Sequence, residues 1–240
     1  MKKLIFSTLA IIGCLIANCQ INSKAELTLT QFIAKVKANA NPQILDARTS
    51  EEFSQNHLKG AINIDLKDDH HQAILDSLDK TKPVFVYSIG NGRSSQLAKQ
   101  LHENKFAEVY ELPGGIANWV GSGNPIISNA KNGLSISPEN FKQIANSEQL
   151  VLVDFGSKYC GACRRLTPTL DSLETAKINK LKIVRLETLS SPDLIKQLGI
   201  NVWPTLVLFK NGEEVWKNTG YISYKVLGQL INSKGQLVAL

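Results

Sequence analysis

The 240-residue sequence has only four cysteines, and its positive charge is not gathered into clusters. Lysine and arginine outnumber aspartate and glutamate by 27 to 21, but the lysines are spread along the chain and are not interleaved with aromatic side chains. Proteins that bind nucleic acids usually concentrate basic residues on one surface. We therefore expect no nucleic-acid partner and interpret the positive charge as a solvated surface.

Long hydrophobic runs are also absent, except at the N-terminus. There Lys2 and Lys3 precede a mostly apolar stretch from Leu4 to Ala17. This stretch is shorter than the roughly 20 residues that a transmembrane helix needs, and it is typical of a cleaved export signal. We therefore predict an exported protein of the periplasm or cell envelope.

Two types of cleavage fit this N-terminal region. The segment Ile16–Cys19 resembles a bacterial lipoprotein signal, in which Cys19 would carry the lipid. Cys14 follows a similar segment, but the residues after it are apolar, which is unusual for a tether. Ordinary cleavage near Ala25 is the alternative. We favour a signal peptide over residues 1–19 and a lipoprotein anchored to the membrane through Cys19.

The rest of the chain retains a single pair of cysteines, Cys160 and Cys163. An exported protein with one closely spaced pair is not a scaffold held together by several disulfides. A tetrahedral zinc site needs more ligands than this pair supplies. The neighbours His70 and His71 follow two aspartates, but they are more typical of a solvated loop. We therefore expect a redox-active pair that needs no metal and no other cofactor.

The two cysteines lie where a buried strand leads into a helix. The apolar run Leu150–Val153 precedes them, and a helical pattern runs from Arg164 to Ala176. A helix N-terminus offers unpaired N–H groups and the positive end of the helix dipole, and both stabilise a thiolate. We assign Cys160 as the nucleophile. Cys163 lies one turn later, close enough to form a disulfide with it.

Residues 134–240 resemble the thioredoxin family. The segment Val153–Phe155 precedes the cysteines at the family's spacing, and Val202–Gly212 is similar to the family's cis-proline, strand and turn. The resemblance implies a thioredoxin fold and thiol–disulfide exchange. In that reaction Cys160 attacks a substrate disulfide, and Cys163 then resolves the mixed disulfide.

Neighbouring residues have expected roles in this exchange. Burial should raise the pKa of Asp154, so that its carboxylate can take the proton of Cys163, directly or through water. A hydrogen-bonded structural acid is the alternative. Gly161 and Ala162 are expected to tune the redox potential. Because alanine stands where general reductases have proline, the potential is expected to be less reducing.

The resemblance also implies a groove for an extended substrate. Its residues are Trp203, Pro204 and Thr205, with a cis peptide bond before the proline. Trp203 is bulkier than the residue usual at this position, so it should narrow the groove or add apolar contact. Simple packing in the core is the alternative for this side chain.

Residues 27–125 resemble a rhodanese-like domain. The matches to its signature segments are Asp46–Arg48, Glu52–Phe53, His57–Ile64 and Leu112–Trp119. In that family, the loop after the central strand begins with a cysteine that carries a transferable sulfur and ends at an arginine. Here Ser88 stands at the cysteine position and Arg93 at the arginine position. A serine hydroxyl cannot hold a transferable sulfur, so we predict no sulfurtransferase activity.

The loop that begins at Ser88 has two interpretations. In the first, the loop binds a small oxyanion through backbone N–H groups and Arg93, with Gly90 and Gly92 in the same loop. Alternatively, it is an inherited loop that binds nothing.

Alternating strands and helices favour an α/β fold in both halves, with residues 126–133 as a linker. The expected helices cover residues 27–39, 51–55, 71–78, 94–104, 164–176, 192–198 and 223–232, with one more that opens near 137. The expected strands cover residues 44–46, 61–64, 84–87, 109–112, 150–153, 182–186, 203–209 and 213–216.

The leading hypothesis is a thiol–disulfide oxidoreductase of the cell envelope that acts on protein thiols and disulfides. The rhodanese-like domain would dock partners or bind an anion. A membrane thiol reductase is the expected electron donor if the protein is a reductase, but the direction of exchange stays open. Two alternatives are a partner- or oxyanion-binding protein with a redox latch, and a sulfur-relay protein, against which Ser88 argues.

Overall fold

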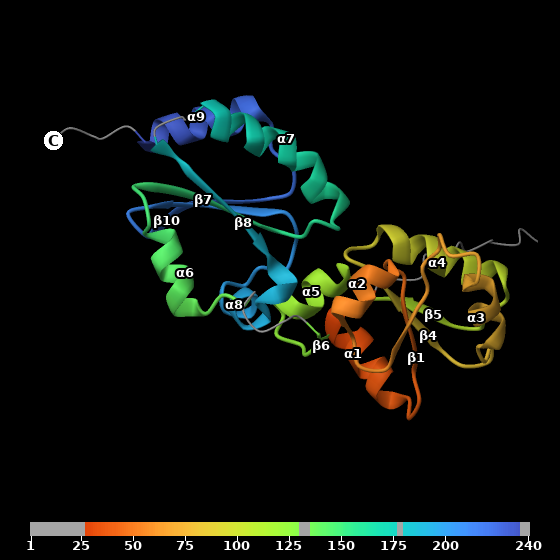
Figure 1. Ribbon diagram of the computed structural model, residues 1–240. Coiled ribbons are helices and arrows are strands. Elements are labelled where there is room, and N and C mark those ends of the chain that lie inside the picture. Colours follow the sequence, from red (N-terminus) through yellow and green to blue (C-terminus); the bar gives the residue numbers. More distant parts are fainter. Residues whose placement is uncertain (1–26, 130–134, 177–179, 236–240) are drawn as a thin grey trace, which may run out of the picture.

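The computed structural model describes residues 27–129, 135–176 and 180–235, which form two α/β domains joined side by side (Figure 1). The expectations about export, cleavage and the lipid at Cys19 concern residues that lie outside these ranges. Among the described residues, none of the helices combines the length and the apolar composition that a membrane crossing requires.

The N-terminal domain is built on a parallel sheet of four strands in the order β3-β1-β4-β5. The strands are β1 (Gln43–Asp46), β3 (Ala61–Asn63), β4 (Val84–Tyr87) and β5 (Val109–Glu111). The helices are α1 (Leu29–Ala38), α2 (Ser50–Gln55), α3 (His71–Ser77), α4 (Gly92–Glu103) and α5 (Gly115–Gly121). A short antiparallel pair, β2 (Asn56–His57) with β6 (Ile127–Ser128), adds a second small sheet.

Both faces of this sheet are buried, which explains the continuous apolar run of β4. Phe85 and Tyr87 pack on one face with Phe32 of α1, whereas Val84 and Val86 pack on the other face, mainly against α3 and α4. The start of α1 is fixed by a capping box between Thr28 and Gln31, in which each side chain bonds the other's backbone N–H.

A buried ion pair closes the end of β1. The guanidinium of Arg48 is fully buried and binds Asp46 at 2.6 Å, and it also donates to the side chain and the carbonyl oxygen of Asn56. A buried charge needs a partner of this kind. The first signature segment, Asp46–Arg48, is therefore a structural clamp that fixes the chain leading into α2.

The C-terminal domain has a mixed sheet in the order β10-β9-β7-β8. The central strand β7 (Leu150–Gly156) runs parallel to β8 (Lys182–Glu187) and antiparallel to β9 (Thr205–Lys210), which pairs in turn with β10 (Glu213–Thr219). The helices are α6 (Pro138–Ala145), α7 (Gly161–Ala176), α8 (Pro192–Gln197) and α9 (Tyr224–Gly235), with a 3₁₀ turn, η2, at Thr188–Ser190.

The helices of this domain cover both faces of its sheet (Figure 1). On one face, leucines of α7 and α9 pack with Leu150 and Leu152 of β7. On the other face, α6 and α8 pack with Val151, Val153 and Phe155. All seven residues of β7 are buried, so this strand is held rigidly where it leads towards the cysteines.

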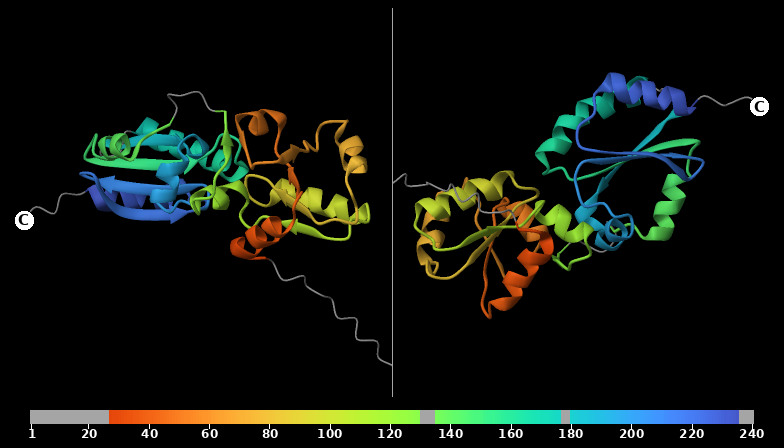
Figure 2. Two further views of the ribbon diagram at one scale, coloured as in Figure 1. Left: turned by 90° about the horizontal axis from the view of Figure 1, so that it is seen from below. Right: turned by 180° about the vertical axis from the view of Figure 1, so that it is seen from behind.

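The two domains share one buried apolar cluster, in which Ile116 and Val120 of α5 meet Leu194 of α8. Figures 1 and 2 show α5 and α8 side by side in all views. A Cβ added at Gly121 would lie 2.3 Å from the carbonyl oxygen of Ile200, so only glycine allows this approach. The domains are therefore packed as one body rather than connected by a loose link.

Several expected boundaries shift in the structure. Residues 127–128 of the expected linker form β6, and Gly115–Gly121 forms a helix that was not predicted. Helix α5 begins with Gly114 and Gly115 at φ values of 69° and 63°, which a helical pattern in the sequence does not indicate. Helix α4 begins two residues before the expected start, α7 begins three residues before it, and β9 begins at Thr205 rather than at 203.

Candidate functional site

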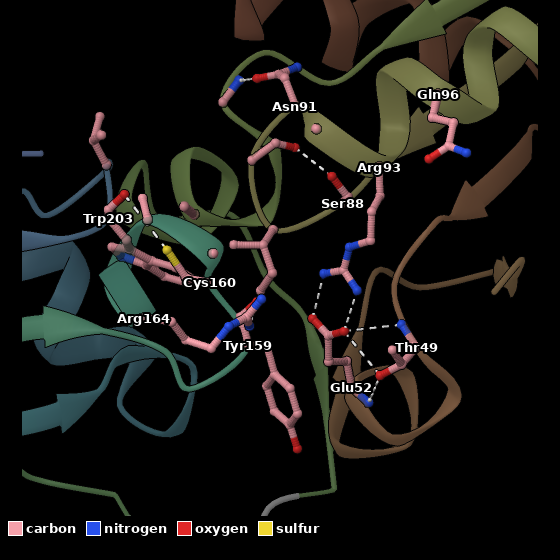
Figure 3. A pocket seen from close by; sticks show the side chains of 18 of the residues that line it. Thr49, Glu52, Ser88, Asn91, Arg93, Gln96, Tyr159, Cys160, Arg164 and Trp203 are labelled. Atoms are coloured by element: carbon pink, nitrogen blue, oxygen red, sulfur yellow. Dashed lines mark hydrogen bonds and ion pairs between the residues drawn. The ribbon is translucent and has the colours of Figure 1, made fainter. Parts of the chain in front are cut away.

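Cys160, which is labelled in Figure 3, directly precedes α7. It forms a disulfide with Cys163. The two Cα atoms are 5.2 Å apart, within the usual range for a disulfide. The backbone N–H of Cys163 donates to Cys160 Sγ at 3.2 Å. When the pair is reduced, this N–H and the helix dipole stabilise a thiolate at Cys160. This arrangement suits Cys160 as the attacking residue and Cys163 as the resolving residue.

The residues around the cis-proline approach the cysteines from β9. The peptide bond between Trp203 and Pro204 is cis, and the carbonyl oxygen of Trp203 lies 3.9 Å from Cys160 Sγ. The Thr205 hydroxyl donates to the carbonyl oxygen of Val202 at 2.7 Å and is buried. Thr205 therefore stabilises the turn, whereas the backbone of Trp203 lies directly against the redox pair.

Asp154 lies in β7 with its Oδ1 buried and without a hydrogen-bond partner. Burial raises the pKa of this carboxyl to about 6, although the charge of Arg185 opposes the shift. A Cβ added at Gly156 would be 3.0 Å from Cys163 Sγ and 3.6 Å from Asp154 Oδ1. Both atoms thus border the small space beside Gly156. A carboxylate with a pKa near 6 is suited to accept a thiol proton there.

The loop between β4 and α4 is organised by its own serine. The buried Ser88 hydroxyl donates to the Gly90 carbonyl oxygen at 2.7 Å and accepts from the Ser94 N–H at 3.3 Å. The carbonyl groups of Ser88 and Ile89 accept from the first turn of α5. Among the described residues, the N–H groups of residues 89–93 have no partner. The loop therefore presents donors, and the serine hydroxyl is used inside it.

Arg93 does not offer a free cation to this loop. Its two terminal nitrogens bind both carboxylate oxygens of Glu52, at 2.5 and 2.8 Å (Figure 3). Burial alone would raise the pKa of Glu52, but hydrogen bonds from Arg93 and Thr49 hold it below its ordinary value. The expectation that Arg93 binds an anion directly thus meets a competing partner. This role of Glu52 is not predicted from the sequence, although the spacing Thr49-x-x-Glu52 indicates a capping box.

A cavity of about 900 Å³ joins the two halves of the site (Figure 3). One wall is the loop from Ser88 to Arg93, with Glu52 behind it. The opposite wall is formed by the segment 159–162 and Trp203. Pro204 and Thr205 are not among the described residues that line it. The sequence does not predict how the two domains face each other, and the structure places Cys160 and the loop at Ser88 across one cavity.

Polar contacts between the domains adjoin the cysteines. Tyr159 Oη donates to Glu51 Oε1 at 2.6 Å and accepts from Gln55 Nε2 at 2.8 Å. Lys158 Nζ also contacts Glu51 Oε1, at 3.3 Å. The hydrogen bond from Tyr159, followed by the contacts with Lys158, holds the pKa of Glu51 below its ordinary value. Helix α2 is thereby fixed beside the residue that precedes Cys160.

Metal ligands are not assembled in the part of the chain that the structure describes. No group of three or more histidine, cysteine, aspartate or glutamate side chains there is placed to hold an ion. The site therefore consists of a cysteine pair, a buried carboxyl group and a loop of N–H donors.

Comparisons with known proteins agree with both resemblances drawn from the sequence. The family model for thioredoxin matches residues 133–233, and the model for a rhodanese-like domain matches residues 28–122. A thioredoxin from Chlamydia muridarum (strain MoPn / Nigg) is 39% identical over 97 residues, covering 40% of this chain and 93% of that protein. A thioredoxin from Alicyclobacillus acidocaldarius subsp. acidocaldarius is 35% identical over 88 residues, covering 37% and 84%.

Among solved structures, a mutant thioredoxin from Halobacterium salinarum NRC-1 is 28% identical, with a TM-score of 0.40, and covers 43% of this chain and 90% of that one. The expected α/β fold class and the order of the two domain types are thus confirmed by the family models and the strand order.

Proposed function

We propose that this protein is a thiol–disulfide oxidoreductase of the cell envelope. The chain belongs to the thioredoxin family and carries a rhodanese-like domain ahead of its thioredoxin domain. It exchanges disulfides with protein substrates through Cys160 and Cys163. The observation that carries this proposal is the cysteine pair at the N-terminus of α7, with the Cys163 N–H 3.2 Å from Cys160 Sγ.

The exchange proceeds in two steps. The Cys160 thiolate attacks a substrate disulfide, which releases one substrate thiolate and forms a mixed disulfide. Asp154 accepts the proton of Cys163, and the Cys163 thiolate then attacks Cys160 Sγ and releases the second substrate thiolate. The carbonyl oxygen of Trp203, beside Cys160, is placed to accept a hydrogen bond from the backbone of an extended substrate.

The location in the cell envelope is part of this proposal. It is supported by the N-terminal sequence, with Lys2 and Lys3 before an apolar stretch and Cys19 in a lipoprotein-like segment. A protein outside the cytoplasm that works as a reductase needs a source of electrons, for which we propose a membrane thiol reductase. The rhodanese-like domain serves as a docking or anion-binding module, because Ser88 cannot carry a transferable sulfur.

A direct test is the reduction of insulin disulfides by the purified protein with dithiothreitol as electron source. We expect turnover by the wild-type chain and loss of at least about 100-fold in Cys160→Ser, because the variant lacks the attacking thiolate. Thiosulfate sulfurtransferase activity is assayed in parallel, and we expect none. Activity of Cys160→Ser equal to the wild-type rate would refute the proposed role of the pair.

One observation favours a second function, a binding protein with a redox latch. Tyr159, next to Cys160, bonds Glu51 and Gln55 across the domain interface. In that case a change in the oxidation state of the pair would alter the interface without turnover. The insulin assay separates the two, since a latch alone reduces no substrate.

A further inference from the structure

We propose that the cavity between the two domains is a single substrate site for disulfides that carry an anionic group. The N–H groups of residues 89–93 hold the anion, and Cys160 exchanges with the sulfur–sulfur bond. This inference rests on the proposed exchange activity of Cys160 and Cys163 and names its substrate class.

The donors that would hold the anion lie on the wall formed by the rhodanese-like loop. Five successive N–H groups, those of residues 89–93, lack partners among the described residues and lead into the 12-residue helix α4. Successive free N–H groups at the positive end of a helix bind anions. A Cβ added at Gly90 or Gly92 would meet nothing within 4 Å, so the space beside both residues is open. Both glycines line the cavity.

Trp203 of the other domain lines the opposite wall, and only 7% of its surface is exposed. Its indole Nε1 is fully buried without a partner and is therefore not part of the cavity surface. The backbone donors available to an anion in the cavity are therefore those of the loop.

The charges around the cavity also favour an anion. Arg93 and Glu52 neutralise each other, which leaves Asp65 as the acidic residue of the lining and Lys67, Arg164 and Arg165 as the basic ones. Among the described residues, none of these three cations has a carboxylate partner, and Arg164 binds only carbonyl oxygens. The excess of positive charge raises the local concentration of anionic substrates.

The size of the cavity limits what can occupy it. A volume of about 900 Å³ is typical of sites for small ligands. It accommodates a small disulfide, or a short extended segment of a polypeptide with an acidic side chain near its disulfide. Both sources share the same chemistry, an anion held on one wall and a disulfide presented to Cys160 on the other.

The reaction needs no further reagent for one turnover of the reduced protein. The Cys160 thiolate attacks one sulfur of R–S–S–R, and the first RS⁻ leaves and takes a proton from solvent. The Cys163 thiolate then attacks Cys160 Sγ, and the second RS⁻ leaves. Two electrons pass from the protein dithiol to the substrate, and the Cys160–Cys163 disulfide forms.

The test measures single-turnover rate constants of the full, pre-reduced chain with matched disulfides. The small-molecule pair is 3,3′-dithiodipropionate, which is anionic, and 2-hydroxyethyl disulfide, which is neutral. The peptide pair carries a disulfide flanked by glutamate or by glutamine. The variants are Gly92→Asp, which places a carboxylate at the donors, and Gly92→Asn, which has nearly the same size without the charge.

We expect the ratio of anionic to neutral rate constants to be about tenfold lower in Gly92→Asp than in Gly92→Asn, because the added charge repels the anion at close range. The wild-type ratio should also fall as salt screens the charges. If only the small-molecule pair responds, the site takes small disulfides; if only the peptide pair responds, it takes acidic segments.

Equal ratios in the two variants for both pairs would overturn the inference while leaving the exchange activity intact. Absence of any reaction of the wild-type protein with either neutral disulfide would instead contradict the proposed function. The two failures are therefore distinguishable.

Discussion

Single side chains determine the protonation chemistry of the redox pair, and Asp154 shows this most clearly. Its carboxyl is 8% exposed, has one oxygen without a hydrogen bond and borders the same space as Cys163 Sγ. Ionising a buried carboxyl costs free energy, so the fold carries a destabilising group where its chemistry needs a base. Evolution towards stability alone would replace it with an apolar residue.

We predict that Asp154→Asn removes a pH dependence of stability. The pKa of Asp154 is about 6 in the folded protein and 3.8 in its ordinary state, so the folded protein binds more protons between these values. Its free energy of unfolding therefore falls as pH rises from about 4 to 6, by about 3 kcal/mol. The oxidised variant should be more stable than wild type at pH 7.5 by up to this amount.

Urea unfolding of both oxidised proteins between pH 4 and 8 measures this difference. The variant should also exchange disulfides more slowly, because Cys163 loses its proton acceptor. A stability difference that does not change with pH would contradict the raised pKa of Asp154.

At the scale of elements, the junction of β4 and α4 explains why a serine is tolerated at the position of a sulfur-carrying cysteine. Carbonyl groups of the loop turn towards Gly115, where a Cβ would come within 2.5 Å of the Ser88 carbonyl oxygen. The N–H groups of residues 89–93 therefore remain on the side of the loop away from Gly115. The Ser88 hydroxyl supports the loop through its own hydrogen bonds. The loop between β4 and α4 thus keeps its N–H donors, although a serine at position 88 cannot carry a transferable sulfur.

We predict that Ser88→Cys introduces a thiol with a pKa below the ordinary value of about 8.5, because the Ser94 N–H, which donates to the side chain at position 88, and the dipole of α4 stabilise the thiolate. The measurement is the rate of alkylation against pH, with the Cys160–Cys163 pair kept oxidised and the wild-type signal subtracted. A midpoint at or above the ordinary value would contradict this stabilisation of the thiolate.

The helices and strands also show which parts of the fold could be predicted from the sequence alone. Buried runs such as Val84–Tyr87 and capped helices such as α1 could be predicted, because their patterns are local. Strand β6 could not, because two exposed residues carry no periodicity and are ordered by pairing with β2. Helix α5 could not be predicted either, because it begins at two glycines with left-handed backbone.

For the candidate site, local motifs indicated the cysteine pair, Asp154 and the loop at Ser88. The partner of Arg93 and the shared cavity could not be predicted, because they depend on how distant segments pack. Glu52 lies 41 residues before Arg93 in the chain, and the walls of the cavity come from two domains.

At the scale of the whole molecule, the interface between α5 and α8 sets the distance between the loop at Ser88 and the segment that carries Cys160. The buried cluster continues from one domain into the other, and Gly121 lets the backbones approach closely. Because the interface is apolar as well as polar, the domains should unfold together rather than in separate steps.

We predict that Gly121→Ala opens this interface. The added Cβ would lie 2.3 Å from the Ile200 carbonyl oxygen and 2.5 Å from the Asn201 Cα, so one backbone must move. Thermal unfolding should change from one transition to two, and small-angle scattering should give a larger radius of gyration. The control is Gly228→Ala, whose Cβ would make an ordinary contact of 4.0 Å with Leu173. Identical behaviour of both variants would contradict the role of Gly121.

The most direct test of the central claim is the redox equilibrium of the purified protein in thiol–disulfide buffers. We expect a reversible two-electron couple between about −270 and −120 mV that is lost in both Cys160→Ser and Cys163→Ser. A value below about −200 mV indicates a reductase, and one near −120 mV indicates a disulfide donor. The absence of a reversible couple in the wild-type protein would contradict thiol–disulfide exchange at this site.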